Sequence, residues 1–105
     1  MQNRILSMLG LAEKSGNVAS GEFSTEQSVK KGKSYLVIIA SDASDNTKKQ
    51  FTDMTTFYDV PCFIYGTKDE LGGAIGKQYR ASISINDENF AKALEKKLRE
   101  ENGGN

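Results

Sequence analysis

The sequence predicts an α/β fold in which helices cover both faces of one sheet. Segments with apolar residues at helical spacing alternate with short apolar or alternating segments along the whole chain. The run "SYLVIIAS" (34–41) is nearly continuous in apolar residues and rich in β-branched ones, as a central buried strand is. The chain has 105 residues, which favours a single domain over 1–101 with a disordered tail over 102–105.

Five segments predict helices. In the first, Ile5, Leu9 and Ala12 recur at helical spacing, and Gly16 gives a stop signal. The fourth opens on a capping box, "TKDE", from Thr67. The predicted helices span residues 3–16, 21–32, 45–59, 67–76 and 86–101.

Four segments predict strands. Among them, "PCFIYG" is expected to be a second buried strand, and "RASISI" places Ile83 and Ile85 on one face. Between these two, Gly72 and Gly73 lie inside a predicted helix, where each weakens the helix, so we expect close packing on the backbone there, of the helix against the sheet. The predicted strands span residues 17–20, 34–41, 61–66 and 80–85.

Composition excludes several classes of function. The 14 basic and 14 acidic residues give a net charge of zero, which argues against strong sequence-independent binding of polyanions. The chain has no histidine and one cysteine, Cys62, which we expect to be a buried apolar residue rather than a nucleophile. Asp42, Asp45 and Asp53 are interpreted as a turn acid, a helix cap and a surface acid rather than metal ligands. We therefore expect no catalysis, no metal and no cofactor.

The start of the chain predicts an amphipathic helix rather than a signal peptide, because no long apolar region follows it. No apolar run approaches the length that spans a membrane. We therefore expect a cytoplasmic protein with no membrane partner, and a monomer.

Three stretches together resemble the L7Ae/L30e ribosomal-protein family, especially its small bacterial members. They are "SGEFSTEQSVKKGKSYLVIIASDAS" (20–44), "VPCFIYGTKDELGGAIGK" (60–77) and "RASISIND" (80–87). The resemblance implies a three-layer α/β/α sandwich with a mixed four-stranded sheet. It also implies binding of kink-turn or related structured RNA, with the ribosome or rRNA as the expected partner. Such RNA is recognised through its shape more than through charge.

The resemblance places RNA contacts on two segments, the start of the second helix and the loop before the last strand. Where the family often has Asn, Glu and Lys, this chain has Phe23, Ser24 and Gln27. The residues implied in the first segment are Gly21, Glu22, Phe23, Ser24, Gln27 and, at its far end, Lys31. Those implied in the second segment are Lys77, Gln78, Tyr79 and Arg80.

Simpler interpretations stand beside these. The segment "SGEFSTEQ" also fits an ordinary helix start capped by Ser20 or Ser24. Phe23 is a stacking surface, a protein contact or a residue tucked against the first helix, and Tyr79 either stacks on a base or is simply exposed. The replaced contacts leave open a second function, a protein-interaction module on the same fold with RNA binding lost.

Overall fold

The computed structural model describes residues 3–101, in which five helices alternate with four strands as predicted. The tail expected over 102–105 lies outside the described residues. The helices are α1 (Arg4–Lys14), α2 (Glu22–Lys30), α3 (Asp45–Phe57), α4 (Lys68–Ala74) and α5 (Glu88–Glu101). The strands are β1 (Val18–Ser20), β2 (Leu36–Ile39), β3 (Cys62–Ile64) and β4 (Ser82–Ile85).

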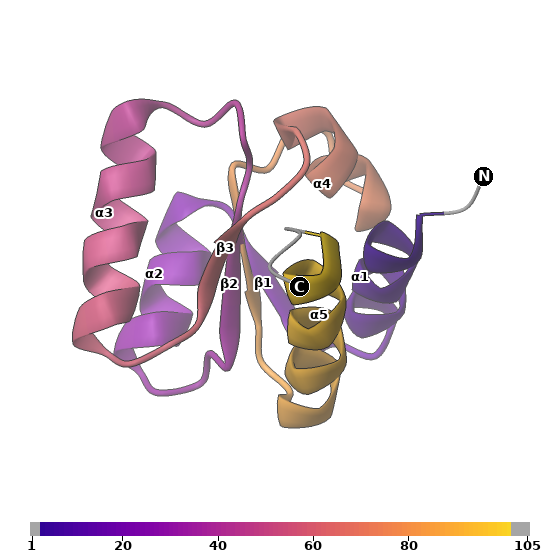
Figure 1. Cartoon of the computed structure of the whole chain (residues 1–105), viewed down its shortest axis with the longest axis horizontal. Coiled ribbons are helices and arrows are strands. Elements are labelled where there is room, and N and C mark those ends of the chain that lie inside the picture. The colour runs from indigo at the N-terminus through magenta and orange to yellow at the C-terminus, as the bar shows by residue number, and fades with distance from the viewer. Residues whose placement is uncertain (1–2, 102–105) are drawn as a thin grey trace.

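The strands form one mixed sheet in the order β1-β4-β2-β3. Strand β2 is parallel to β3 and antiparallel to β4, and β4 is antiparallel to β1. Helices α2 and α3 cover one face of the sheet, and α1, α4 and α5 cover the other (Figure 1). The three-layer α/β/α sandwich is therefore confirmed.

The two inner strands, β2 and β4, hold the centre of the core. All four residues of each strand are buried, so the prediction of a central strand in "SYLVIIAS" is confirmed. Helices α1 and α5 close the core on one side with Leu9, Leu94 and Leu98, each with no exposed surface. On the other side, α3 contributes Phe51.

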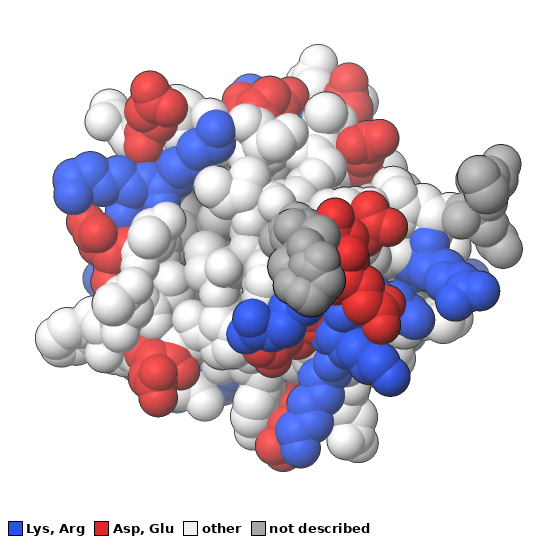
Figure 2. Space-filling model, viewed as in Figure 1, with Lys and Arg blue, Asp and Glu red and all other residues white. Residues whose placement is uncertain are grey.

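The prediction of a buried strand in "PCFIYG" is wrong. Strand β3 lies at the sheet edge, where it pairs only with β2, and its residues are half-buried or exposed. Ile64 keeps 45% of its surface exposed. The surface over this edge, between α3 and α5, is largely free of charged side chains (Figure 2). A short apolar run does not distinguish an edge strand from a central one, because its period does not report how many neighbours it has.

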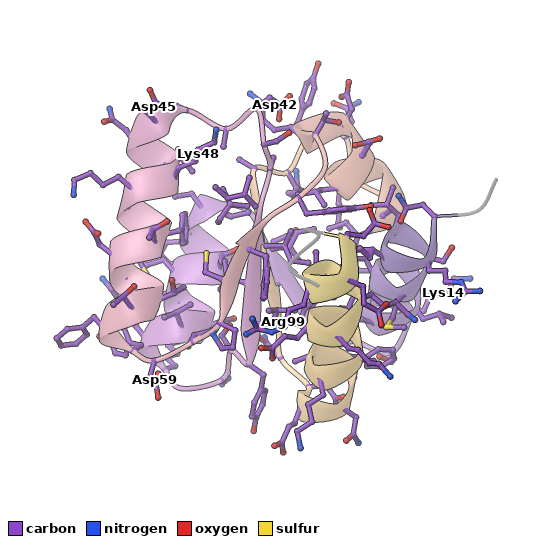
Figure 3. The ribbon with its side chains drawn as sticks, in the orientation of Figure 1. Lys14, Asp42, Asp45, Lys48, Asp59 and Arg99 are labelled. Carbon is purple, nitrogen blue, oxygen red and sulfur yellow. The ribbon has the colours of Figure 1, made fainter. Side chains whose placement is uncertain are left out.

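Three helices begin at the same end of the molecule. Gly21, before α2, donates its N–H to the carbonyl of Ser82, which pairs with Ile39 at the end of β2. The loop after β2 leads into α3, and its Asp42 accepts a hydrogen bond of 2.9 Å from the N–H of Lys68 at the start of α4. Figure 3 shows Asp42 at this end and Asp59, after α3, at the opposite one.

Two of these three helices have side-chain caps. Thr67 and Glu70 form the predicted capping box at α4. At α3 the prediction of Asp45 as the cap is wrong, because Ser44 occupies the cap position and accepts the N–H of Thr47 at 3.1 Å. Asp45 follows in the first helical turn, where its negative charge suits the helix dipole.

Candidate nucleic-acid interface

The start of α2 has no side-chain cap, so the interpretation that Ser20 or Ser24 caps this helix is wrong. The cap position is Gly21, with a φ of 90°, a conformation that favours glycine. The Ser20 hydroxyl instead accepts a hydrogen bond of 2.9 Å from Nε of Arg80. The helix therefore begins with N–H groups that its cap residue does not occupy, which is the arrangement that suits an anionic ligand.

The loop Lys77–Arg80 is seated on α4. A Cβ built on Gly72 would lie 2.3 Å from the carbonyl oxygen of Gln78, so the loop backbone occupies the space of the missing side chain. The N–H of Arg80 donates to the carbonyl of Lys68 at 3.2 Å. A close approach to the backbone is thus confirmed at Gly72, but the neighbour is this loop and not the predicted sheet, and a Cβ on Gly73 would meet nothing within 4 Å.

The two segments implied by the resemblance meet in space. Two hydrogen bonds link them through the adjoining strands: Arg80 Nε bonds to Ser20 Oγ at the end of β1 at 2.9 Å, and the N–H of Gly21 bonds to the carbonyl of Ser82 at the start of β4 at 3.0 Å. A third, of 3.3 Å, joins Ser82 Oγ to Thr25 Oγ1 one turn into the helix. Residues 21–27 and 77–80 therefore form one continuous surface.

One side of α2 is turned away from the sheet, with Phe23 and Ser24 exposed and Gln27 half-buried. Phe23, Gln27 and Lys31 recur four residues apart, so they form one stripe, with Ser24 beside it. Phe23 keeps 73% of its surface exposed, which excludes the interpretation that it tucks against the first helix. Lys31 lies about 15 Å along the helix from Gly21, at 1.5 Å per residue. It therefore lengthens the surface at the far end of α2 and does not contribute to the helix start.

Charge on this surface is mixed. Lys77 is exposed, Arg80 is half-buried, and Glu22 is exposed on the first turn of α2. Glu26 forms an ion pair of 2.6 Å with Lys30, and that hydrogen bond raises the pKa of the lysine. The pairing offsets one of the two acidic groups near the start of the helix.

Two kinds of feature are absent from residues 3–101 as the structure describes them. No group of three or more acidic or cysteine side chains is placed to hold a metal ion, and no helix there is long and apolar enough to cross a membrane. The lone thiol, Cys62, is half-buried, and burial raises its pKa, which disfavours the nucleophilic thiolate.

The hydroxyl of Ser20 is the contact at this surface that the sequence alone did not reveal. It is the partner that fixes the guanidinium of Arg80, sixty residues away in the sequence. No signal in a single sequence connects the two residues. The place where the loop packs on α4 was detectable in the sequence, because Gly72 is a helix-weakening residue inside a helical pattern.

Comparisons with known proteins point in one direction. The model of the ribosomal protein L7Ae/L30e/S12e/Gadd45 family matches residues 3–95. RNA-binding protein YlxQ of Enterococcus faecium is 36% identical over 91 residues, which cover 87% of each chain.

Two solved structures share the fold. A Bacillus halodurans protein of unknown function superposes with a TM-score of 0.90 at 35% identity, covering 92% of this chain and 98% of that one. The 15.5kD RNA binding protein of Giardia lamblia superposes with a TM-score of 0.78, covering 95% of this chain and 92% of that one. The second is 22% identical, so its likeness concerns the fold alone.

Proposed function

The chain belongs to the ribosomal protein L7Ae/L30e/S12e/Gadd45 family, and from that premise we propose that it binds structured RNA, without catalysis, through the start of α2 and the loop Lys77–Arg80. The observation that carries the proposal is the pair of hydrogen bonds that joins these segments, Arg80 to Ser20 and Gly21 to Ser82. They hold a helix start and a loop together without the RNA, so little ordering is needed on binding. The relatives named as RNA-binding proteins support the same function.

Each part of the surface has a role in this proposal. The N–H groups at the start of α2 and the ammonium of Lys77 bind backbone phosphates. Gln27 carries an amide that both donates and accepts, so it reads a base edge or holds a phosphate. Tyr79, with 63% of its surface exposed, offers a ring on which a base stacks.

The net charge of zero sets an expectation for how binding depends on salt. Only Lys31, Lys77 and Arg80 supply positive charge among the proposed contacts. With about three phosphates neutralised, log K should fall against log salt concentration with a slope of about −2 to −3. Shape and hydrogen bonding then supply much of the affinity, as they do for folded RNA.

We propose a kink-turn, or an rRNA element of similar shape, as the target. The family resemblance supports this target, and the replacement of its usual contact residues by Phe23, Ser24 and Gln27 is the feature most open to test. The ribosomal members of the family support association with the ribosome, and the proposal also includes a monomeric state and action in the cytoplasm.

The direct test is a titration of the protein into a labelled kink-turn hairpin. The control hairpin has both sheared G·A pairs replaced by Watson–Crick pairs, and both are measured at low and moderate salt. Preferential binding to the kink-turn is the expected result. Equal binding to both hairpins contradicts the kink-turn target, and absence of binding to either contradicts the use of this surface for RNA of this kind.

The exposed phenyl ring of Phe23 favours one alternative, a protein-interaction module on the same fold. Aromatic side chains are enriched at protein interfaces, and this one replaces a residue with which the family often contacts RNA. The alternative predicts that the purified protein retains no nucleic acid after a high-salt wash, as judged by its absorbance at 260 nm. It also predicts that the double change Ser24→Glu, Gln27→Lys, which keeps the ring of Phe23, has no effect on kink-turn binding, whereas the RNA proposal predicts tighter binding.

A further inference from the structure

Two large aromatic side chains stand out from the proposed RNA surface. Phe23, on the first turn of α2, keeps 73% of its surface exposed, and Tyr79, in the loop before β4, keeps 63%. Neither ring serves the core. They belong to the two segments that the Arg80–Ser20 hydrogen bond joins.

Both rings are carried by fixed backbone. Phe23 follows Gly21, whose carbonyl accepts the N–H of Thr25 at 3.0 Å and so closes the first turn of the helix. The carbonyl of Tyr79 accepts a hydrogen bond of 2.6 Å from Nη1 of Arg80, whose Nε is bonded to Ser20. The same guanidinium thus ties the backbone that carries Tyr79 to the residue before the helix that carries Phe23.

The helix also directs Phe23 outward. At 100° per residue, Phe23 is about 160° around α2 from the buried Thr25, so it points almost directly away from the sheet. Gln27 and Lys31 lie on the same stripe, one and two turns further along. A strand that followed this stripe would meet an aromatic face first, then an amide, then a positive charge.

We propose that Phe23 stacks on an unpaired base, so that the RNA presents unstacked nucleotides to both rings, one at Phe23 and another at Tyr79. This inference rests on the proposed function and specifies its target as an RNA with an open internal loop or bulge. Phenylalanine has no hydrogen-bonding group, so it accepts the π-face of any base and cannot read a paired base edge. The contact at Phe23 is therefore indifferent to the identity of the base but requires that the base be free.

The surroundings of the two rings favour RNA over a protein partner. Lys77 and Arg80 flank Tyr79, and Gln27 and Lys31 follow Phe23 along the helix. Groups that bind phosphate next to exposed rings are the combination by which single-stranded nucleic acid is held. Lysine, in contrast, is depleted in protein–protein interfaces.

The chain supplies a matched control in Phe57, the last residue of α3. Its ring is 81% exposed and packs edge-to-face on Tyr58, with ring centroids 4.9 Å apart. Helices α2 and α3 begin at the same end of the molecule, so the end of α3 lies at the opposite end from Phe23 (Figure 1). Phe57→Ala removes the same chemical group from a surface that the proposal does not use.

The experiment titrates the protein into the kink-turn hairpin labelled with 2-aminopurine, a base that loses fluorescence on stacking, at each unpaired position in turn. The variants are Phe23→Ala, Phe23→Leu, Phe23→Trp, Tyr79→Ala and Phe57→Ala. Phe23→Ala should weaken binding about fivefold to a hundredfold, the loss expected for one stacked base, and abolish quenching at one position. Tyr79→Ala should abolish it at a different position, and Phe57→Ala should match the parent protein.

Two comparisons separate stacking from other roles. Phe23→Leu keeps an apolar side chain without a ring and should bind as weakly as Phe23→Ala, whereas Phe23→Trp should bind at least as tightly as the parent. An abasic nucleotide at the position quenched by Phe23 should weaken the parent protein, and Phe23→Ala should then add no further loss. Replacing that nucleotide with any other base should change affinity less than twofold.

The results distinguish this inference from the function on which it rests. If the parent protein binds the kink-turn and Phe23→Ala binds it with the same affinity, the inference is overturned and the proposed function stands. Tolerance of leucine at position 23, with unchanged quenching, overturns it in favour of an apolar protein contact. Failure of the parent protein to bind either hairpin overturns the proposed function itself, and this inference with it.

Discussion

Adjacent glycines in α4 should respond to the same substitution with opposite signs. A Cβ on Gly72 would lie 2.3 Å from the oxygen and 2.7 Å from the carbon of the Gln78 carbonyl, and 3.1 Å from the nitrogen of Tyr79. These are backbone atoms, so no side-chain rotation relieves the overlap. A Cβ on Gly73, which is exposed, would meet nothing within 4 Å.

The magnitudes follow from two competing terms. Alanine in place of glycine in a helix gains up to about 1 kcal/mol, and Gly73→Ala should realise most of it. Gly72→Ala gains the same propensity but forces the loop off its seat, at a cost of about 1 to 3 kcal/mol for overpacking. We therefore expect Gly73→Ala to raise the free energy of unfolding and Gly72→Ala to lower it, by about 1 kcal/mol each, or about 4 °C in Tm.

Thermal and urea unfolding, followed by far-ultraviolet circular dichroism, measure the stability of both variants. RNA titration supplies a second readout, because Gly72→Ala must displace Gln78 and Tyr79 and should weaken binding, whereas Gly73→Ala should leave it unchanged. Equal shifts of Tm in the same direction would refute the reasoning. So would a Gly72→Ala variant that is less stable but binds RNA as the parent does, since the loop would then not be what moved.

Two further substitutions test the local geometry. Asp59 has a φ of 60° just after α3, at the position where α1, α2 and α4 are each followed by a glycine of positive φ. Asp59→Gly should therefore raise the free energy of unfolding by about 1 kcal/mol, as measured by thermal unfolding. Asp59→Ala should lower it, because alanine keeps a Cβ and lacks the short polar side chain that lets aspartate tolerate this conformation. Ser20→Ala removes the hydroxyl that accepts the hydrogen bond from Arg80 Nε, and should lower the free energy of unfolding by only about 0.5 to 1.5 kcal/mol. Because the guanidinium is then no longer held, RNA binding in the kink-turn titration should weaken severalfold. Unchanged affinity would show that this bond does not organise the surface.

The sequence predicted the elements well because their signals are local. The helical spacing of Ile5, Leu9 and Ala12 reports one buried face, and all three residues are buried in the structure. The continuous run in β2 reports burial on both faces, which an inner strand of a covered sheet requires. The capping box from Thr67 needs only residues within one turn, and it formed as predicted.

Three features that the sequence did not resolve share a cause, which is a partner distant in sequence. Ser20 fits the composition of a helix cap, yet its hydroxyl bonds to Arg80, which lies just before the neighbouring strand β4. Gly72 and Gly73 are adjacent in one predicted helix, and the course of the loop about six residues later decides which of them must be glycine. The location of β3 at the edge depends likewise on which strands pair, which no short segment specifies.

The candidate site was predictable only in outline. The resemblance implied two segments, and hydrogen bonds between them give that pairing a physical basis. The exposure of Phe23, which decides between a tucked ring and a free one, required the structure. Roles of individual residues toward RNA remain proposals that the titrations test.

The attachment of α2 to the sheet explains how a small helix offers a precisely positioned start. Its buried face carries only one apolar side chain with the hydroxyls of Thr25 and Ser28, so apolar packing alone would fix its position weakly. Hydrogen bonds to β4 and the residue after it supply the direction: Ser82 Oγ to Thr25 Oγ1 at 3.3 Å, and Asn86 Nδ2 to Ser28 Oγ at 3.1 Å. Such bonds are lost when the helix slides or rotates by even a fraction of a turn, whereas apolar contacts tolerate the shift.

The same strand carries the loop Lys77–Arg80 at its start, so β4 supports both halves of the proposed RNA surface. Any movement of α2 relative to this loop must break the bonds of Gly21 and Thr25 to Ser82, together with the bond of Ser20 to Arg80. Those bonds lie within one helical turn of Phe23. The spacing between the two exposed rings is therefore set by β4 and not by the RNA. Because the site is already ordered before binding, the stacking free energy of both rings contributes to affinity and is not used to offset the entropy cost of ordering the site.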